Sequence, residues 1–203
     1  MLTYYTNPQS RGQIPHWMLE EVGQPYATEV VAYDKIGDAA YRAVNPMAKV
    51  PALVDDGKVV TECAAIVAYL AERFLEAGLA PTPDERADYY RWLFFTAGPL
   101  EQAVISKAMG WTIDDPARGR MLGFGDFERP LNVLSEHLAG RDYVCGARFT
   151  AADVYVGSQV DWGLQFGTFP ATRAFTAYAE RLRERPAYKR CKAINAELMQ
   201  AAA

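Results

Sequence analysis

The sequence has no long apolar run. Nowhere among its 203 residues do about 18 apolar residues follow one another without interruption, the length that a membrane-spanning helix needs. The first residues, Met-Leu-Thr-Tyr-Tyr, contain no basic segment followed by an apolar one, so no secretory signal is visible. We therefore expect a cytoplasmic protein with no membrane partner.

Cysteine and basic clusters are also scarce. Cys63, Cys145 and Cys191 are odd in number, far apart and outside any Cys-x-x-Cys spacing, which argues against a disulfide framework or a zinc site. We predict free thiols and no bound metal. The net charge of −4 comes without a block of basic residues, so the chain lacks the electrostatic signature of a nucleic-acid-binding protein.

The composition and length of the chain indicate a folded protein with a hydrophobic core in each domain. Half of the residues are hydrophobic and 23% are charged, and 203 residues suffice for one large or two small domains. The first part reads as a strand, a helix ended by Gly23, and a second strand. Two short strands joined at Asp56-Gly57 and a further helix follow. This βαβ-ββα order is typical of a thioredoxin-like domain.

The rest of the chain has the 3.6-residue period of helices. Two prolines in Ala80-Pro81-Thr82-Pro83 indicate a linker, so we predict a thioredoxin-like domain over residues 1–80 and an all-helical domain over 84–203. The fold class is α+β. The predicted helices of the second domain cover residues 84–109, 117–139, 151–165, 171–184 and 187–200.

Val50-Pro51 is the most informative dipeptide of the chain. It directly precedes the short strand at 52–54, where a proline cannot donate to the sheet. A cis bond at Pro51 would leave the N–H and C=O of Val50 facing outward, able to pair with an extended peptide ligand. An ordinary trans proline at a strand edge is the alternative.

A helix start follows the hairpin, at Thr61-Glu62. Ile66, Leu70 and Phe74 mark the apolar face of this helix. Its first N–H groups favour a carboxylate, and the acidic side chain of Glu62 can take an ammonium group, so together they form a receptor for the head of an amino acid. The alternative is that Glu62 only complements the helix dipole.

These motifs carry a family resemblance. The run Asn-Pro-x-x-Lys-Val-Pro-Ala-Leu, followed by Asp-Gly and by Thr-Glu-x-x-Ala-Ile-x-x-Tyr-Leu, resembles the glutathione-binding half of cytosolic glutathione transferases, closest to bacterial, beta-like members. Residues 146–153 resemble the capping motif of their second domain. The resemblance implies a homodimer that binds glutathione as co-substrate, with no permanently bound cofactor, and an apolar small-molecule electrophile in the helical domain.

Two other functions remain compatible with this resemblance. One is a glutathione-dependent peroxidase or disulfide reductase, with Cys63 as its candidate redox residue. The other is a non-enzymatic ligand-binding protein that kept the fold without the chemistry.

The loop after the first strand should activate the thiol. Free thiols titrate at about 8.5, and a hydrogen-bond donor near a helix start lowers that value. Serine-type relatives carry Ser-Pro-x-x-Arg, whereas this chain has Asn7-Pro8-Gln9-Ser10-Arg11 and no cysteine at the beta-like position. We predict Asn7 and Ser10 as the catalytic pair. A turn role for Asn7 and a helix-capping role for Ser10 are the alternatives.

The resemblance assigns further glutathione contacts. Cys63 stands where relatives have a serine that contacts the γ-glutamyl carboxylate, so a strong hydroxyl donor becomes a weak thiol donor; a buried, inert Cys63 is the alternative. Lys35 or Lys49 is expected to bind the glycyl carboxylate, beside Val50. Glu101 stands where beta-like members have a histidine, whose role is therefore not carried over.

Aromatic and other apolar side chains are candidates for the electrophile pocket. Tyr4 and Tyr5 should point to opposite faces of the first strand, with Tyr5 in the cleft. From the helical domain we predict Met109, Trp111 and Phe166 as pocket residues, and assign Trp92, Phe95 and Trp162 to packing.

Thr150 and Asp153 form a capping box before an apolar run. We predict a structural role for this pair, with a cost of about 0.5–2 kcal/mol for Asp153→Ala.

Overall fold

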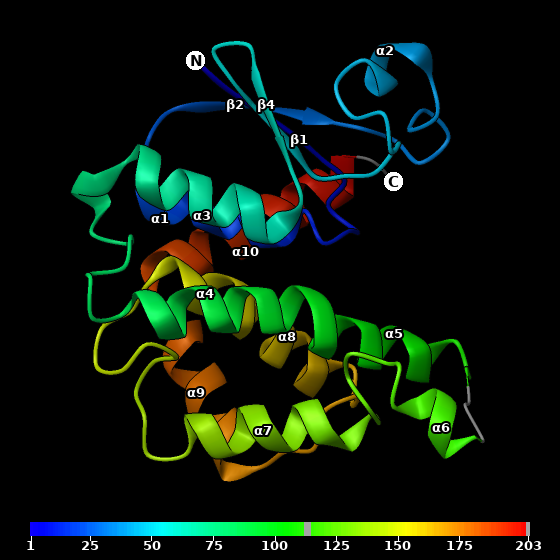
Figure 1. Cartoon of the computed structure of the whole chain (residues 1–203). Coiled ribbons are helices and arrows are strands. Elements are labelled where there is room, and N and C mark those ends of the chain that lie inside the picture. Colours follow the sequence, from blue (N-terminus) through cyan, green and yellow to red (C-terminus); the bar gives the residue numbers. More distant parts are fainter. Residues whose placement is uncertain (112–114, 202–203) are drawn as a thin grey trace. The chain divides into compact units, whose positions relative to one another are not determined.

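The computed structural model describes residues 1–111 and 115–201 (Figure 1). They form two compact units, of which the first joins Met1–Ala80 to Arg183–Ala203 and the second is Pro81–Leu182. The C-terminal helix therefore packs with the thioredoxin-like part, although the sequence grouped it with the helical one.

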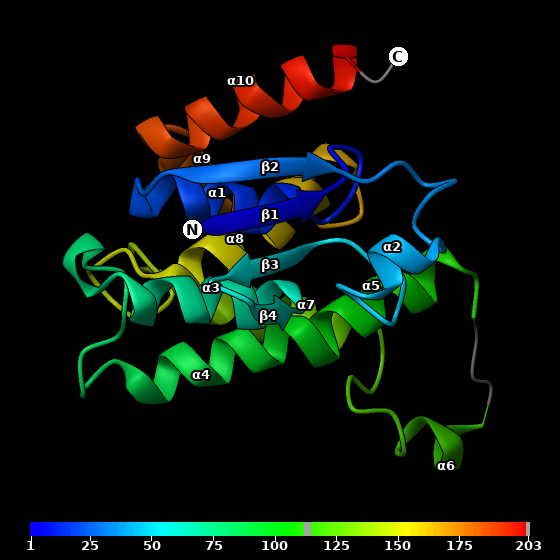
Figure 2. The ribbon, with the colours of Figure 1, turned by 90° about the horizontal axis from the view of Figure 1, so that it is seen from above.

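The first unit is built on a sheet, which has four strands within the fully described residues 1–80. Their order is β2-β1-β3-β4, with β1 and β2 parallel and the other pairs antiparallel (Figure 2). The predicted hairpin turn is confirmed: Asp56 and Gly57 have φ values of 47° and 84°, the left-handed pair that a tight hairpin requires. The strands are β1 Leu2–Thr6, β2 Tyr26–Val30, β3 Ala52–Asp55 and β4 Lys58–Thr61.

Helices cover one face of this sheet. α1 and α3 lie on that side, whereas the short α2 lies beyond the ends of the strands, and no helix of the described residues is drawn over the other face in the view from above (Figures 1 and 2). The order is thus βαβαββα, so the thioredoxin-like prediction is confirmed, with α2 added in a segment that the sequence left unassigned. The helices of this unit are α1 Gln13–Val22, α2 Ala39–Arg42, α3 Cys63–Arg73, the 3₁₀ turn Leu75–Ala77 and α10 Pro186–Ala201.

Alternation along β1 decides which tyrosine enters the core. Tyr4 is fully buried on the α1 side, where its ring lies 5.6 Å from that of His16. Leu53 of β3 and Ile66 of α3 are fully buried in the same core, and side chains of successive strand residues point to opposite faces. Tyr5 therefore faces the other side of the sheet, where its ring lies 6.0 Å from that of Tyr41.

The second unit is helical, as predicted. The helix predicted over 84–109 is present as one continuous helical stretch, in which α4 and α5 are joined by a π-helical turn that contains Pro99, a residue that cannot keep the regular hydrogen-bond ladder (Figure 1). The helix predicted over 117–139 is split at residues 120–127, where Gly125 has a φ of 73° and Asp126 caps the N–H of Arg129. The elements are α4 Arg86–Phe95, the π-turn Thr96–Leu100, α5 Glu101–Ala108, α6 Pro116–Gly119, α7 Glu128–Leu138, α8 Ala151–Gln165 and α9 Arg173–Arg183.

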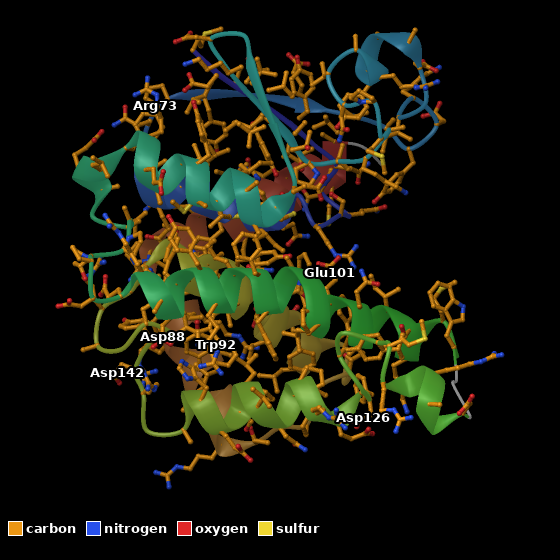
Figure 3. The ribbon with its side chains drawn as sticks, viewed as in Figure 1. Arg73, Asp88, Trp92, Glu101, Asp126 and Asp142 are labelled. Atoms are coloured by element: carbon orange, nitrogen blue, oxygen red, sulfur yellow. The ribbon has the colours of Figure 1, made fainter. Side chains whose placement is uncertain are left out.

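Helix α8 forms the centre of the second unit, since its residues are buried from Ala151 to Asp161. The predicted capping box at Thr150 and Asp153 is confirmed. Trp92 packs between α4 and α7 (Figure 3), with its ring 4.2 Å from that of His137, as the packing assignment predicted. Glu101, at the start of α5 (Figure 3), accepts a hydrogen bond from Tyr155 at 3.1 Å.

None of the helices formed by the described residues is long and apolar enough to cross a membrane. In the same part of the chain, no three His, Cys, Asp or Glu side chains are grouped so that they could hold a metal ion.

Candidate functional site

Three segments that carry the predicted site meet at one end of the sheet. β1 ends at Thr6, and its residue Tyr5 pairs with Ala52 at the start of the neighbouring strand β3. Ala52 in turn pairs with Thr61 at the end of β4. The loop after β1, the Val50-Pro51 segment before β3 and the first turn of α3 after β4 are therefore neighbours.

Hydrogen bonds to its backbone carbonyls fix the loop between β1 and α1. Every carbonyl from Thr6 to Gly12 accepts a hydrogen bond, for example Thr6 from the N–H of Val31 at 2.8 Å and Pro8 from the side-chain amide of Gln13 at 2.7 Å. A loop whose polar groups are all paired keeps one conformation, because each departure would break a bond. Any side chain on it is thus presented in a fixed position.

Ser10 lies half-buried in this loop. Its hydroxyl donates to the carbonyl of Asn7 at 2.6 Å and accepts the N–H of Gly12 at 2.9 Å. The Asn7 carbonyl also accepts the backbone N–H of Ser10 at 3.0 Å. The hydroxyl proton can therefore turn toward a ligand without leaving that carbonyl unpaired. A helix-capping serine accepts a backbone N–H in the same way as Ser10 accepts that of Gly12. Ser10 is nevertheless not the N-cap residue, because α1 begins at Gln13.

Asn7 is buried, and its side chain stabilises the loop through hydrogen bonds to backbone groups. The amide nitrogen donates to the carbonyl of Val31 at 3.1 Å, and the amide oxygen accepts the N–H of Gln9 at 2.9 Å. These are the contacts of a turn-forming asparagine. The geometry thus places Asn7 in the scaffold that carries Ser10.

Gly12 is a site residue that the sequence analysis missed. A Cβ atom at this position would lie 2.0 Å from Oγ1 of Thr6, so no larger residue fits without moving the loop. The hydroxyl of Tyr4 donates to the Gly12 carbonyl, and burial raises the pKa of Tyr4 well above its usual value, which keeps it a donor. The position of Gly12 just before a predicted helix was the sequence feature that could have indicated this close packing.

The segment before β3 is equally fixed. The Val50–Pro51 bond is cis, as predicted. The carbonyl of Lys49 accepts both the Tyr41 hydroxyl at 2.6 Å and the side-chain amide of Asn45 at 2.7 Å. Burial raises the pKa of Tyr41 to about 12, so it remains a donor at neutral pH. Asn45, which opens the sequence motif and is buried, had been given no role.

The first turn of α3 begins at an unusual backbone conformation. Glu62 has φ 67° and ψ 124°, a region that costs a non-glycine residue free energy and that clusters at functional sites. Its exposed side chain makes no capping hydrogen bond to the described helix start. The carboxylate is therefore accessible beside the N-terminal end of the helix, as the receptor hypothesis requires.

Cys63 connects this turn to the β1–α1 loop. It is buried, and its thiol donates to the carbonyl of Arg11 at 3.6 Å. Buried thiols with such a packing role are typically inert. The geometry favours the structural alternative for Cys63 over the redox one.

The remaining predicted residues are distributed over β1, the segment after β2 and the second unit. Tyr5 is on the opposite face of the sheet from Tyr4. Lys35 is exposed, with its ammonium 3.9 Å from Asp34 and 4.0 Å from Asp38. In the second unit the three predicted pocket residues are exposed, at 61%, 63% and 76% for Met109, Trp111 and Phe166.

Comparison with known proteins agrees with this architecture. Residues 11–73 match the glutathione S-transferase N-terminal domain, and residues 120–186 match the glutathione S-transferase C-terminal domain. The chain is 30% identical over 150 residues to the glutathione S-transferase GstA of Escherichia coli O157:H7, an alignment that covers 72% of this chain and 73% of the relative.

Solved structures are similar over nearly the whole chain. A glutathione transferase from Methylococcus capsulatus str. Bath has a TM-score of 0.78 at 28% identity, covering 97% of this chain and 99% of the other. A theta class glutathione S-transferase from Xanthomonas axonopodis pv. citri, solved with glutathione bound, has a TM-score of 0.73 at 28% identity and covers 93% and 95%. The chain belongs to the glutathione S-transferase family.

Proposed function

We propose that this protein is a glutathione transferase that conjugates the thiolate of glutathione to a small apolar electrophile. One observation supports this most: the half-buried Ser10 hydroxyl, the cis Val50–Pro51 segment and the first turn of α3 lie at one end of one sheet. A peptide ligand placed there meets a sulfur donor, a backbone partner and a receptor for its charged head. Glutathione as the ligand is supported by the similar theta class structure, which was solved with glutathione bound.

Each part of glutathione has a proposed partner. The N–H and C=O of Val50 pair with the peptide backbone, next to Pro51. Glu62 takes the γ-glutamyl ammonium group, and the N-terminal end of α3, at Cys63, takes the adjacent carboxylate. Lys49 is the better placed cation for the glycyl carboxylate because it adjoins Val50, whereas Lys35 would have to leave Asp34 and Asp38.

Ser10 is the proposed thiolate donor, with Asn7 as the residue that holds it. When glutathione loses its thiol proton to solvent, the Ser10 hydroxyl turns from the Asn7 carbonyl to the sulfur anion. The N–H of Gly12 on the Ser10 oxygen strengthens this donor, since hydrogen bonds in a chain polarise one another. The anion then attacks the electrophilic carbon and expels its leaving group.

The electrophile is proposed to bind the helical unit at Met109, Trp111 and Phe166, whose exposed apolar surface suits such a substrate. We further propose a homodimer, supported by the exposed Tyr90 and Phe94, which lie four residues apart on α4. Assignment to the beta-like members and a cytoplasmic location remain predictions of the sequence analysis.

Turnover of three substrate types tests the proposal. The purified protein is assayed with glutathione and an aryl halide, a hydroperoxide or a small disulfide. We expect conjugation of the aryl halide, because Cys63 is buried and bonded to the Arg11 carbonyl. Turnover of only the hydroperoxide or the disulfide would favour the redox alternative, and apolar ligand binding without any turnover would favour the carrier.

A further inference from the structure

Helix α10 packs along α1 within the first unit, through specific side-chain contacts. The rings of Trp17 and Tyr188 meet edge to face, with centroids 5.1 Å apart. Arg185 donates to the buried carboxylate of Glu21 at 2.7 and 2.8 Å. These contacts keep the register between the two helices.

One contact of α10 continues toward the candidate site. The ammonium of Lys192 lies 3.2 Å from Oε1 of Gln13, the first residue of α1. The Nε2 atom of the same amide donates to the carbonyl of Pro8 at 2.7 Å. Lys192 on the C-terminal helix is thereby connected to the β1–α1 loop through a single side chain.

The charge on Lys192 decides which way the Gln13 amide points. An ammonium group can only donate, so the oxygen of the amide must face it and the nitrogen must face the loop. The charge also polarises the amide and strengthens its bond to the Pro8 carbonyl. Without Lys192, the amide oxygen loses this partner, and only the bond to the Pro8 carbonyl, now weaker, still orients the amide.

Because Pro8 lies two residues before Ser10 in the same loop, we propose that Lys192 and Gln13 are positioning residues that hold the Ser10 hydroxyl in place. This inference rests on the proposed function, in which Ser10 stabilises the thiolate. The C-terminal helix then contributes to the glutathione site through Gln13 and without contacting the ligand.

Amide hydrogen exchange on the full-length protein without ligand tests the positioning by itself. In Lys192→Met we expect the amides of Ser10 and Gly12 to exchange roughly two- to fivefold faster, the effect of weakening one hydrogen bond. Exchange within α10 should change little: Lys192→Met removes the contact of its ammonium with the Tyr188 ring at 5.3 Å, but the Tyr188–Trp17 contact and the ion pair of Arg185, which precedes α10, with Glu21 remain. Lys189→Met is the matched control, because Lys189 is exposed on the same helix and pairs only with Glu184 among the described residues. Equal exchange in Lys192→Met and Lys189→Met would overturn the proposal.

Thiolate absorbance of bound glutathione tests the connection to Ser10. We expect Lys192→Met to bind roughly two- to fivefold less thiolate near neutral pH, and Lys192→Arg to restore it. A thiolate signal in Lys192→Met equal to that of wild type would refute the connection. A wild-type protein without any thiolate signal would contradict the proposed function instead, while the exchange result would still decide whether Lys192 positions the loop.

Discussion

Replacing Asp153 by alanine removes an acceptor that several buried donors share. The carboxylate accepts the backbone N–H groups of Val144 and Thr150 at 2.7 and 2.8 Å, and the hydroxyl of Tyr178 at 2.7 Å. Each buried donor left unpaired costs about 1–3 kcal/mol, while removal of a buried charge offsets part of the loss. We expect Asp153→Ala to lower the free energy of unfolding by about 2–4 kcal/mol at pH 7.5, more than the capping box alone predicted.

The same carboxylate gives this cost a pH dependence. Burial raises the pKa of Asp153 to about 6, above its value in the unfolded chain, although its hydrogen bonds lower it. The part of its contribution that depends on protonation is therefore fully present below about pH 4 and is lost as the pH rises through about 6, whereas the hydrogen bonds to the carboxylate remain at pH 7.5. The difference between wild type and Asp153→Ala should be about 1–2 kcal/mol larger at pH 5 than at pH 7.5.

Urea unfolding followed by circular dichroism at the two pH values measures both effects. Asp142→Ala is the control, because Asp142 is an exposed carboxylate paired with Arg181 (Figure 3), and surface pairs contribute less than about 1 kcal/mol. Tyr178→Phe removes a single donor and keeps the test usable if Asp153→Ala does not fold. The reasoning would be refuted if Asp153→Ala cost no more stability than Asp142→Ala. It would also be refuted if the stability difference between wild type and Asp153→Ala became smaller at pH 5 than at pH 7.5.

Three further substitutions test other parts of the structure. Gly12→Ala should abolish the thiolate signal and lower the unfolding midpoint, because its Cβ would lie 2.0 Å from Thr6 Oγ1; wild-type behaviour in both assays would contradict this packing. Cys63→Ser should lower the KM for glutathione roughly two- to fivefold, since a hydroxyl is the stronger donor; an unchanged or higher KM would argue against a carboxylate site there. Phe94→Asp should yield monomers in light scattering if α4 forms the dimer contact, and a persistent dimer would exclude that surface.

Features encoded by short stretches of sequence were predicted well. The Asp56-Gly57 turn, the cis Val50–Pro51 bond and the capping box at Thr150 each depend on a few consecutive residues. The turn and the capping box follow from local chemistry, whereas the cis bond, the less common isomer of X–Pro bonds, was inferred from the sequence motif around it.

Features that depend on distant contacts were not predictable in this way. Nothing near Asp153 in the sequence indicates that Tyr178 also bonds to it, and nothing near Gln13 indicates its contact with Lys192. The side that Tyr5 faces depends on which face of the sheet α1 and α3 cover. Pro99 was a local signal for the π-helical turn between α4 and α5, but the helical period around it outweighed that signal.

Titration of glutathione near pH 7, followed by ultraviolet thiolate absorbance, tests the central claim most directly. Wild type is compared with Ser10→Ala and with Ser135→Ala, a serine on α7 whose hydroxyl bonds to Thr172. The account predicts a saturable thiolate signal in wild type and Ser135→Ala that is lost in Ser10→Ala. A saturable signal of equal size in Ser10→Ala would contradict it and leave thiolate stabilisation to the backbone or to Asn7.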